Sequence, residues 1–204
     1  MSKKRVYVID DDDAMRDSLD FLLGAAGFKV AVFDSAARFL EKLPGMEFGC
    51  VVSDVRMAGI DGIELLKRIR SGEKAFPVIM MTGHGDIRLA VEAMKLGAAD
   101  FLEKPFEDDR LISTIEDALK RRNDATSGSS INREIAARIE SLSPRERQVM
   151  EGLVAGLSNK VIARDYDISP RTIEVYRANV MTKMQANSVS ELVRLAIRGG
   201  LIQD

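Results

Sequence analysis

Short apolar runs alternate with helix-patterned segments five times in the first 122 residues, and this alternation constrains the fold more than any other feature of the sequence. Apolar runs of four or five residues, bounded by polar residues or glycine, are typical of strands that are buried on both faces. Strands that alternate with helices form a parallel sheet, and right-handed crossovers place helices on both of its faces. We therefore predict an α/β fold, a doubly wound five-stranded parallel sheet, with strands at 5–9, 29–33, 50–53, 77–81 and 99–102.

The alternation ends near residue 122. Residues 123–130 are small, polar and rich in serine, as flexible linkers are. Ile131, Ile135 and Ile139 then recur at four-residue spacing, which favours a linker helix. We therefore predict a first domain over residues 1–122, a linker over 123–138, and a second, smaller all-α domain over 139–204.

The C-terminal part has the pattern of short helices only. Ser143, Pro144 and Glu146 have the order of a capping box, which opens a helix. Further helices are predicted from 158 or 159 to 164, from 170 to 184, and from 189 to 198. Only a short turn at 165–168 separates the second of these helices from the third, and this arrangement favours a helix-turn-helix.

The composition excludes several classes of protein. Hydrophobic residues make up 46% and charged residues 30% of the 204 residues, a balance that suits a globular chain rather than a disordered one. No stretch approaches the roughly 20 apolar residues of a membrane-spanning helix, and no export signal precedes the first strand. The single cysteine, Cys50, lies in an apolar stretch, so we expect it to pack rather than to react, and we expect a cytoplasmic location.

The net charge of −2 argues against a nucleic-acid-binding protein, but the charge is unevenly distributed. Residues 168–200 contain five basic and two acidic residues, so positive charge is concentrated late in the chain. This asymmetry is a weak indication of nucleic-acid binding.

Four of the predicted strands are followed by residues suited to ionic chemistry: Asp10 and Asp11, Asp54, Thr82, and Lys104. In a doubly wound sheet the carboxyl ends of the strands share one edge, where such folds bind their ligands. We therefore expect these five residues to converge on one site. The alternative is a structural one, in which the aspartate run caps the following helix and the lysine is simply solvated.

Three carboxylates in one site repel one another, by about 4 kcal/mol for a pair ~4 Å apart at an effective dielectric constant of ~20, unless a cation joins them. Only oxygen ligands are available here, so Mg²⁺ fits better than zinc. Such a site suits phosphoryl transfer, because a carboxylate could attack a neutralised phosphoryl group in line. Thr82 and Lys104 would then contact the transferred group.

These residues, together with Pro105, resemble the motifs of the receiver domain of bacterial two-component response regulators, over essentially all of residues 1–122. The resemblance implies that Asp54 accepts a phosphoryl group from a sensor histidine kinase. It also implies that Lys104 contacts this group and that Thr82 and Phe101 form a switch pair.

The same resemblance implies a Mg²⁺ site made by Asp11, Asp54 and the backbone carbonyl of Arg56, with Asp10 assisting. One position departs from the family pattern, because Ala58 stands where the family usually has proline. This departure leaves the loop after Asp54 more flexible and the chemistry intact.

A helical wheel over residues 170–184 separates an apolar side from a side with small and charged residues. On periodicity alone, an ordinary amphipathic helix with a solvated face remains an alternative. The segments 142–147, 156–160 and 169–176, however, resemble the LuxR-type helix-turn-helix, and the likeness extends over residues 139–204.

This second resemblance implies that the helix at 170–184 enters the major groove of double-stranded DNA. The face implied for reading bases has Arg171, Glu174, Val175, Ala178 and Thr182, and Thr172 is also implied to contact DNA. The residues implied for contacting phosphates are Asn159, Lys160, Arg177 and Lys183. Tyr176 and Glu174 stand where the family often has histidine and lysine, which leaves the recognised DNA sequence open.

From end to end the chain resembles the response regulators of rhizobial oxygen-responsive nitrogen-fixation control. The resemblance implies a factor that forms a homodimer when phosphorylated, binds promoter DNA and acts on RNA polymerase. It further implies activation of nitrogen-fixation and microaerobic genes under low oxygen, with no membrane partner. Catalysis is expected to be limited to the chain's own phosphoryl transfer and dephosphorylation.

Two other functions remain open at this stage. A phosphohydrolase of the haloacid dehalogenase kind would carry its nucleophile beside the first strand and would need a cap domain, which the C-terminal helices do not resemble. A DNA-binding protein with an inert receiver is the other alternative, and the complete set of carboxylates argues against it.

Overall fold

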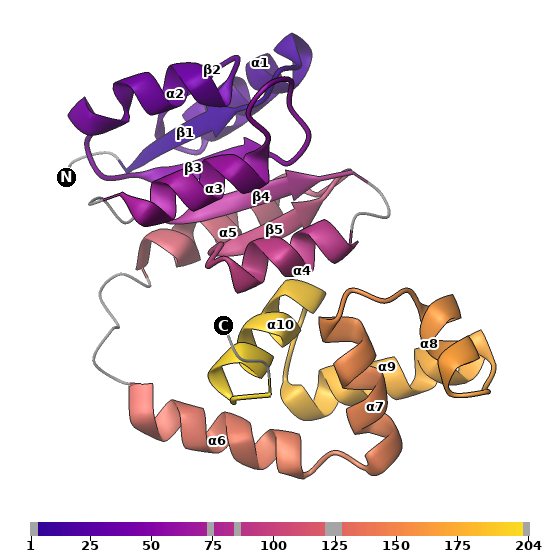
Figure 1. Cartoon of the computed structure of the whole chain (residues 1–204). Coiled ribbons are helices and arrows are strands. Elements are labelled where there is room, and N and C mark those ends of the chain that lie inside the picture. The colour runs from indigo at the N-terminus through magenta and orange to yellow at the C-terminus, as the bar shows by residue number, and fades with distance from the viewer. Residues whose placement is uncertain (1–3, 73–75, 84–86, 121–127, 202–204) are drawn as a thin grey trace. The chain divides into compact units, whose positions relative to one another are not determined.

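The structure is a computed structural model that describes residues 4–72, 76–83, 87–120 and 128–201 (Figure 1). Internal contacts divide the chain into two compact units, one with residues 1–86 and 96–124 and the other with residues 87–95 and 125–204. The boundary predicted between residues 122 and 123 lies outside the described residues. Within the described ranges, no helix has both the length and the apolar character needed to cross a membrane.

The first unit contains a five-stranded parallel sheet in the order β2-β1-β3-β4-β5, which confirms the predicted fold class. The strands are β1 (Arg5–Ile9), β2 (Lys29–Phe33), β3 (Cys50–Asp54), β4 (Val78–Thr82) and β5 (Asp100–Glu103). Asp54 and Thr82 are therefore the last residues of their strands instead of following them, because Asp54 pairs with Met81 and Thr82 with Glu103. The sheet thus fixes the backbone of both residues.

Helices connect consecutive strands: α1 (Asp13–Ala25), α2 (Ala36–Lys42) with the 3-10 turn η1 (Leu43–Gly45), α3 (Gly62–Ser71) and α4 (Ile87–Lys95). The helix α5 (Asp108–Lys120) follows β5. Asp12 caps α1 by accepting a hydrogen bond from the N–H of Met15, and Asp61 caps α3 in the same way through Glu64. Part of the aspartate run therefore does cap a helix, as the structural alternative predicts.

The helices α1 and α5 cover one face of the sheet (Figure 1). Apolar side chains on that face pack against them to form the main core. The core residues from the helices are Leu19, Leu23, Leu111, Ile115 and Ala118. On the other face, the Tyr7 ring lies 5.9 Å from the ring of Phe39 in α2, and Gly62 at the start of α3 lies against Met80. Cys50 is buried in the main core, where burial strongly raises the pKa of its thiol, so it packs as predicted.

The second unit contains five helices C-terminal to the sheet: α6 (Gly128–Glu140), α7 (Pro144–Val154), α8 (Asn159–Asp165), α9 (Pro170–Met184) and α10 (Val189–Arg198). Both hydrogen bonds of the predicted capping box form between Ser143 and Glu146 at the start of α7. α6 occupies much of the predicted linker, and its Ile135 and Ile139 are buried against Gly199.

A tight turn joins α8 to α9, with Asp167 in the left-handed region at φ 52°. α7 comes so close to α8 that a Cβ added at Gly152 would lie 2.8 Å from Ile162 Cγ1. The close approach of α7 and α8 therefore favours glycine at position 152. The helices α8 and α9, with the tight turn between them, have the form of a helix-turn-helix.

Candidate functional site

The carboxyl edge of the sheet brings Asp10, Asp54 and Lys104 into direct contact. Asp10 follows β1 with only 2% of its surface exposed, and Asp54 ends β3 with 9% exposed. The ammonium group of Lys104, which follows β5, lies 3.0 Å from Asp10 Oδ2 and 2.5 Å from Asp54 Oδ1. The lysine thus supplies the cation that two facing carboxylates require.

Backbone groups complete the surroundings of these two carboxylates. Asp54 Oδ2 accepts a hydrogen bond of 2.7 Å from the N–H of Arg56, and Asp10 Oδ1 accepts one of 3.0 Å from the N–H of Asp12. The N–H of Lys104 in turn donates to the carbonyl oxygen of Thr82 at 2.7 Å. The lysine is therefore positioned by the end of β4.

Burial and ion pairing shift the pKa of Asp54, and likewise that of Lys104, in opposite directions. Burial raises the pKa of Asp54 more than its hydrogen bonds to Lys104 and to the N–H of Arg56 lower it. Burial by itself lowers the pKa of Lys104, but hydrogen bonds to Asp54 and Asp10 outweigh that effect and raise it. Lys104 therefore remains an ammonium ion at neutral pH, and its hydrogen bond to Asp54 opposes the effect of burial on the pKa of that carboxyl group.

The other predicted receiver residues lie nearby but make different contacts. Asp11 is exposed, and its Oδ2 accepts a hydrogen bond of 3.1 Å from the N–H of Ala58. The Thr82 side chain is buried, and its hydroxyl donates to the carbonyl of Gly83 at 3.4 Å. Phe101 is half-buried at the second position of β5. These residues therefore share the carboxyl edge of the sheet, where the side chains of Asp10, Asp54 and Lys104 pair with one another.

In the part of the chain that the structure describes, no three acidic, histidine or cysteine side chains lie together in a group able to hold a metal ion. The donor chemistry nevertheless fits Mg²⁺, because Asp10, Asp11 and Asp54 offer only hard oxygen ligands. Lys104 occupies the space between two of these carboxylates, so a metal ion would compete with its ammonium group.

Sequence reasoning missed Arg16, which buttresses the site from α1. Its Nη1 donates to the backbone carbonyl of Asp10 at 2.7 Å, and its Nη2 pairs with Asp13. A basic residue in the first turns of a helix opposes the helix dipole, so a tertiary partner is needed to favour it there. The unfavourable position of a basic residue near the start of a helix is the signal that could have identified Arg16.

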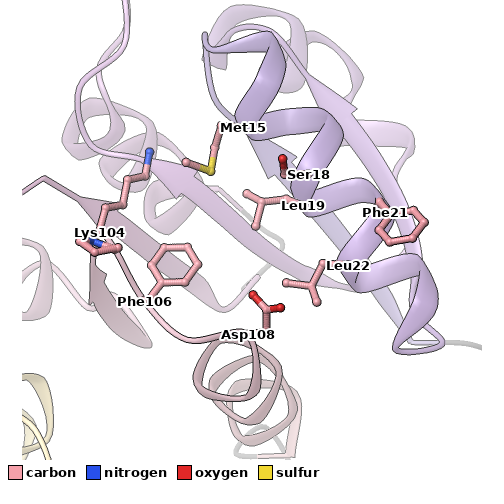
Figure 2. Close-up of a pocket in the computed structure, with 9 residues that line it drawn as sticks. Met15, Ser18, Leu19, Phe21, Leu22, Lys104, Phe106 and Asp108 are labelled. Carbon is pink, nitrogen blue, oxygen red and sulfur yellow. The ribbon is translucent and has the colours of Figure 1, made fainter.

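An apolar groove of about 640 Å³ lies between α1 and the segment that follows β5, as Figure 2 shows. Its lining includes Met15, Leu19, Leu22 and Phe106, and Lys104 lies along it. Phe21, also on α1, is 81% exposed. Lys104 therefore belongs both to the groove and to the carboxylate site.

The helix α9 presents the face predicted to read bases. Arg171, Glu174, Val175 and Ala178 are exposed, whereas Ile173, Val180 and Met184 are buried as the wheel predicts. Val175 exposes 57% of its surface, a high fraction for a branched apolar side chain in a folded domain. The outer face is thus free to contact a partner through both apolar and charged groups.

Two of the residues predicted to contact DNA make contacts within the protein. The hydroxyl of Thr172 shares a hydrogen bond of 2.8 Å with that of Ser169, which caps α9. Lys183 Nζ lies 2.7 Å from Glu146 Oε2 in α7. Of the residues predicted to contact phosphates, Lys160 is exposed, and Asn159 and Arg177 are half-buried.

Comparison with known proteins decides the family. A family model described as "Response regulator receiver domain" matches residues 6–116, and a model described as "Bacterial regulatory proteins, luxR family" matches residues 140–196. The chain is 69% identical over 203 residues to "Transcriptional regulatory protein FixJ" of Bradyrhizobium diazoefficiens, covering 100% of this chain and 99% of that protein. The chain is a FixJ-type response regulator.

Other relatives agree with this assignment. The FixJ protein of Azorhizobium caulinodans is 56% identical, with 96% of this chain and 93% of that protein covered. A crystal structure described as full-length FixJ from B. japonicum shares 68% identity with a TM-score of 0.59, covering all of both chains. A low-resolution structure of the response regulator StyR is 39% identical with a TM-score of 0.56, covering 96% of this chain and 98% of that one.

Membership of the FixJ type places this chain among the transcriptional regulators that join a receiver to a DNA-binding helix-turn-helix. A receiver implies a histidine kinase as partner, and a LuxR-type domain implies DNA. The phosphohydrolase alternative is wrong, because the receiver model and the luxR-family model match the two halves of the chain. The assignments of individual residues stay predictions.

Proposed function

We propose that this response regulator accepts a phosphoryl group on Asp54 and that phosphorylation controls the binding of α9 to promoter DNA. The observation that carries this proposal is the position of the Asp54 carboxylate. It lies at the end of a central strand, with Lys104 Nζ 2.5 Å from one oxygen and the N–H of Arg56 2.7 Å from the other. A buried carboxylate with two such donors is held in one orientation at an open edge of the sheet.

In the transfer step, an Asp54 carboxylate oxygen attacks the phosphorus of a phosphohistidine on the sensor kinase. A P–O bond forms as the P–N bond breaks, and the electron pair stays on the imidazole. Lys104 then pairs with the new phosphoryl oxygens instead of the carboxylate, and so stabilises the charge that Asp54 acquires. Asp10 keeps the lysine near this position throughout.

Asp11, Asp54 and the carbonyl of Arg56, with Asp10 assisting, would hold Mg²⁺. When bound, the ion neutralises phosphoryl oxygens in addition to Lys104. Thr82 and Phe101 are proposed as the pair that responds, since Thr82 ends β4 and its partner strand β5 carries Phe101. A shift of the buried threonine hydroxyl towards the phosphoryl group would free space for the half-buried ring.

We infer that the kinase docks on the groove beside α1. This groove is apolar, its Lys104 also contacts Asp54, and the exposed Phe21 extends the apolar surface. A partner that covers it therefore brings its phosphohistidine next to the acceptor.

For the output, phosphorylation would produce a homodimer through the segment 86–102, of which residue 86 lies outside the described residues. Two α9 helices would then occupy successive major grooves, with half-sites about 10 bp apart, and recruit RNA polymerase. The proposed domains are residues 1–122 and 139–204 with a linker at 123–138, and the proposed location is the cytoplasm. The proposed targets are nitrogen-fixation and microaerobic genes activated under low oxygen.

Incubation with a small phosphoryl donor and Mg²⁺ tests the acceptor. We expect the intact mass to rise by one phosphoryl group, through an acid-stable, base-labile bond located on Asp54 by peptide mapping. The Asp54→Asn variant should show no increase, whereas Asp20→Asn, which changes an exposed carboxylate on α1, should be labelled normally. A phosphoryl group on serine or histidine, or full labelling of Asp54→Asn, would contradict the proposal. The absence of any labelling would also contradict it and would favour an inert receiver.

The variant Phe21→Ala serves as a second control in the same assay. A small donor needs no docking surface, so its labelling should match that of the wild type. Transfer from a phosphorylated sensor kinase should be slower, because the exposed ring is the largest apolar group that a docked partner would cover.

The raised pKa of Asp54 predicts a pH-dependent stability. Between its ordinary value of 3.8 and the higher folded value, the folded protein binds more protons than the unfolded chain, so stability falls as pH rises through this window. The Asp54→Asn variant has no carboxyl group at this position, so its stability does not fall in this pH window. We therefore expect it to be more stable than the wild type at neutral pH without divalent cations, and the difference to vanish below pH 3.8. Urea melts over a pH series check this, and Asp20→Asn should show no such pH-dependent difference.

A further inference from the structure

Glu146 is unusual for a capping-box residue, because its side chain is buried and also pairs with a lysine outside the cap. It is only 5% exposed, and its Oε2 accepts hydrogen bonds of 2.7 Å from both the N–H of Ser143 and the ammonium of Lys183. Glutamine closes a capping box as well as glutamate does. The cap therefore does not need the charge of Glu146, whereas Lys183 does.

These contacts also explain the titration of the carboxylate. The hydrogen bond from Lys183, followed by that from the N–H of Ser143, lowers the pKa of Glu146 against the effect of burial. Glu146 is thus an ion at neutral pH, paired with a residue in the last turn of α9.

The next residue of α9 is held from a second helix. The guanidinium of Arg138 in α6 donates to the backbone carbonyl of Met184 at 3.3 Å, and Glu134 orients that guanidinium at 2.6 Å. A cation at this position satisfies a carbonyl that has no partner within the helix and complements the negative end of the helix dipole. Gln185, at φ 55°, ends α9 immediately afterwards.

Lys183 and Met184 are consecutive, so Glu146 of α7 and Arg138 of α6 both bind the last turn of α9. The exposed residues predicted to read bases lie on the preceding turns, with Arg171 at the opposite end. A helix of 15 residues is about 20 Å long, and a tilt of a few degrees at one end displaces the other by about 1–2 Å. Such a displacement is enough to spoil hydrogen bonds with base edges.

We propose that Glu146, Lys183 and Arg138 are positioning residues for DNA recognition, which fix the angle of α9 by clamping its C-terminal turn. Lys183 then acts through Glu146 and not by contacting a phosphate. This inference rests on the proposed role of α9 as the reading helix. It adds that α6, which occupies much of the predicted linker, contributes directly to the orientation of that helix.

The test compares binding to two DNA duplexes over a salt series: one that the phosphorylated wild-type protein selects from a randomised library, and one with the same bases scrambled. The variants of the full chain are Glu146→Gln, Lys183→Met and their double mutant. We expect each single variant to reduce the ratio of selected to scrambled affinity roughly three- to tenfold. The double mutant should be no worse than the poorer single variant, because both remove one interaction.

The direction in which Glu146→Gln changes DNA affinity distinguishes a positioning role from a simple effect of charge. Glu146→Gln removes a negative charge, so without a clamp it should strengthen binding to both duplexes. The clamp predicts weaker binding to the selected duplex despite that gain. For Lys183→Met we expect an unchanged salt slope, whereas Lys160→Ala, at an exposed lysine predicted to contact phosphate, should reduce the slope by about 0.9.

Three results would overturn parts of this picture. A reduced salt slope for Lys183→Met would make that residue a phosphate contact, and an unchanged affinity ratio for Glu146→Gln would remove the clamp. If Arg171→Ala also left base preference unaltered, the reading role of α9 itself would fail. Should the Glu146 variants not fold, Arg138→Gln leaves the capping box intact, and an unchanged affinity ratio for it would equally refute the clamp.

Discussion

Gly62→Ala is expected to lower the free energy of unfolding by about 3 kcal/mol and to abolish phosphorylation of Asp54. A Cβ at this position would lie 2.4 Å from the carbonyl oxygen of Asp54, 2.5 Å from Met80 Cε and 2.9 Å from Val55 Cα. Two of these three atoms belong to the backbone, which cannot move aside without breaking the end of β3. The hydrogen bond of 2.9 Å from the N–H of Gly62 to the Val55 carbonyl would be strained as well.

Gly24→Ala is the matched control, because it adds the same methyl group to another helix of the same unit. A Cβ at Gly24 in α1 would meet no atom within 4 Å. Alanine favours a helix over glycine, so this variant should be more stable by about 0.5–1 kcal/mol and should label normally. Urea melts and donor labelling measure both effects. A Gly62→Ala protein with wild-type stability would show that the start of α3 does not pack closely against the end of β3.

Lys104→Ala should destabilise the protein by about 2 kcal/mol in the absence of divalent cations, less than for a fully buried pair because the lysine side chain is 23% exposed. The variant leaves Asp10 and Asp54 facing each other without a counter-ion. Mg²⁺ should therefore raise the melting temperature of the variant more than that of the wild type, and it should bind more tightly where no ammonium competes.

Lys4→Ala is the control for this experiment. Lys4 pairs with Glu116 at 3.4 Å, and both side chains are more than 40% exposed, so its loss should change stability by less than about 1 kcal/mol with or without Mg²⁺. Equal responses of Lys104→Ala and the wild type to Mg²⁺ would show that lysine and metal do not share a site.

The sheet and the general position of the candidate site were predictable because they depend on periodicity. Apolar runs that alternate with helical segments indicate parallel strands, and the carboxyl ends of parallel strands lie at one edge of the sheet. Whether Asp54 belongs to β3 or follows it depends on its pairing with Met81, which no local pattern encodes. The contact of Lys104 with both Asp10 and Asp54 depends on side-chain rotamers and on burial, so sequence reasoning placed the lysine correctly and missed its partners.

In the helical unit, too, the helices were predictable from the sequence and a long-range side-chain contact was not. The capping box predicted the first residue of α7, and the range predicted for the third helix, 170–184, matches α9. The partner of Lys183 was not predictable, because Glu146 lies 37 residues away and already had a role in the cap. A residue with one evident role is rarely assigned a second from sequence alone.

The strand order has a consequence for synthesis on the ribosome. Asp10 and Asp54 lie at the carboxyl ends of neighbouring strands, but β2 and two helices separate them along the chain, and Lys104 is reached only after β5. A nascent chain therefore lacks the acceptor geometry until residue 104 has left the exit tunnel, and it gains that geometry while α7, α8 and α9 are still to be made. If Asp54 and α9 have the proposed roles, each new molecule passes through an interval in which it can take up a phosphoryl group but cannot yet contact a promoter.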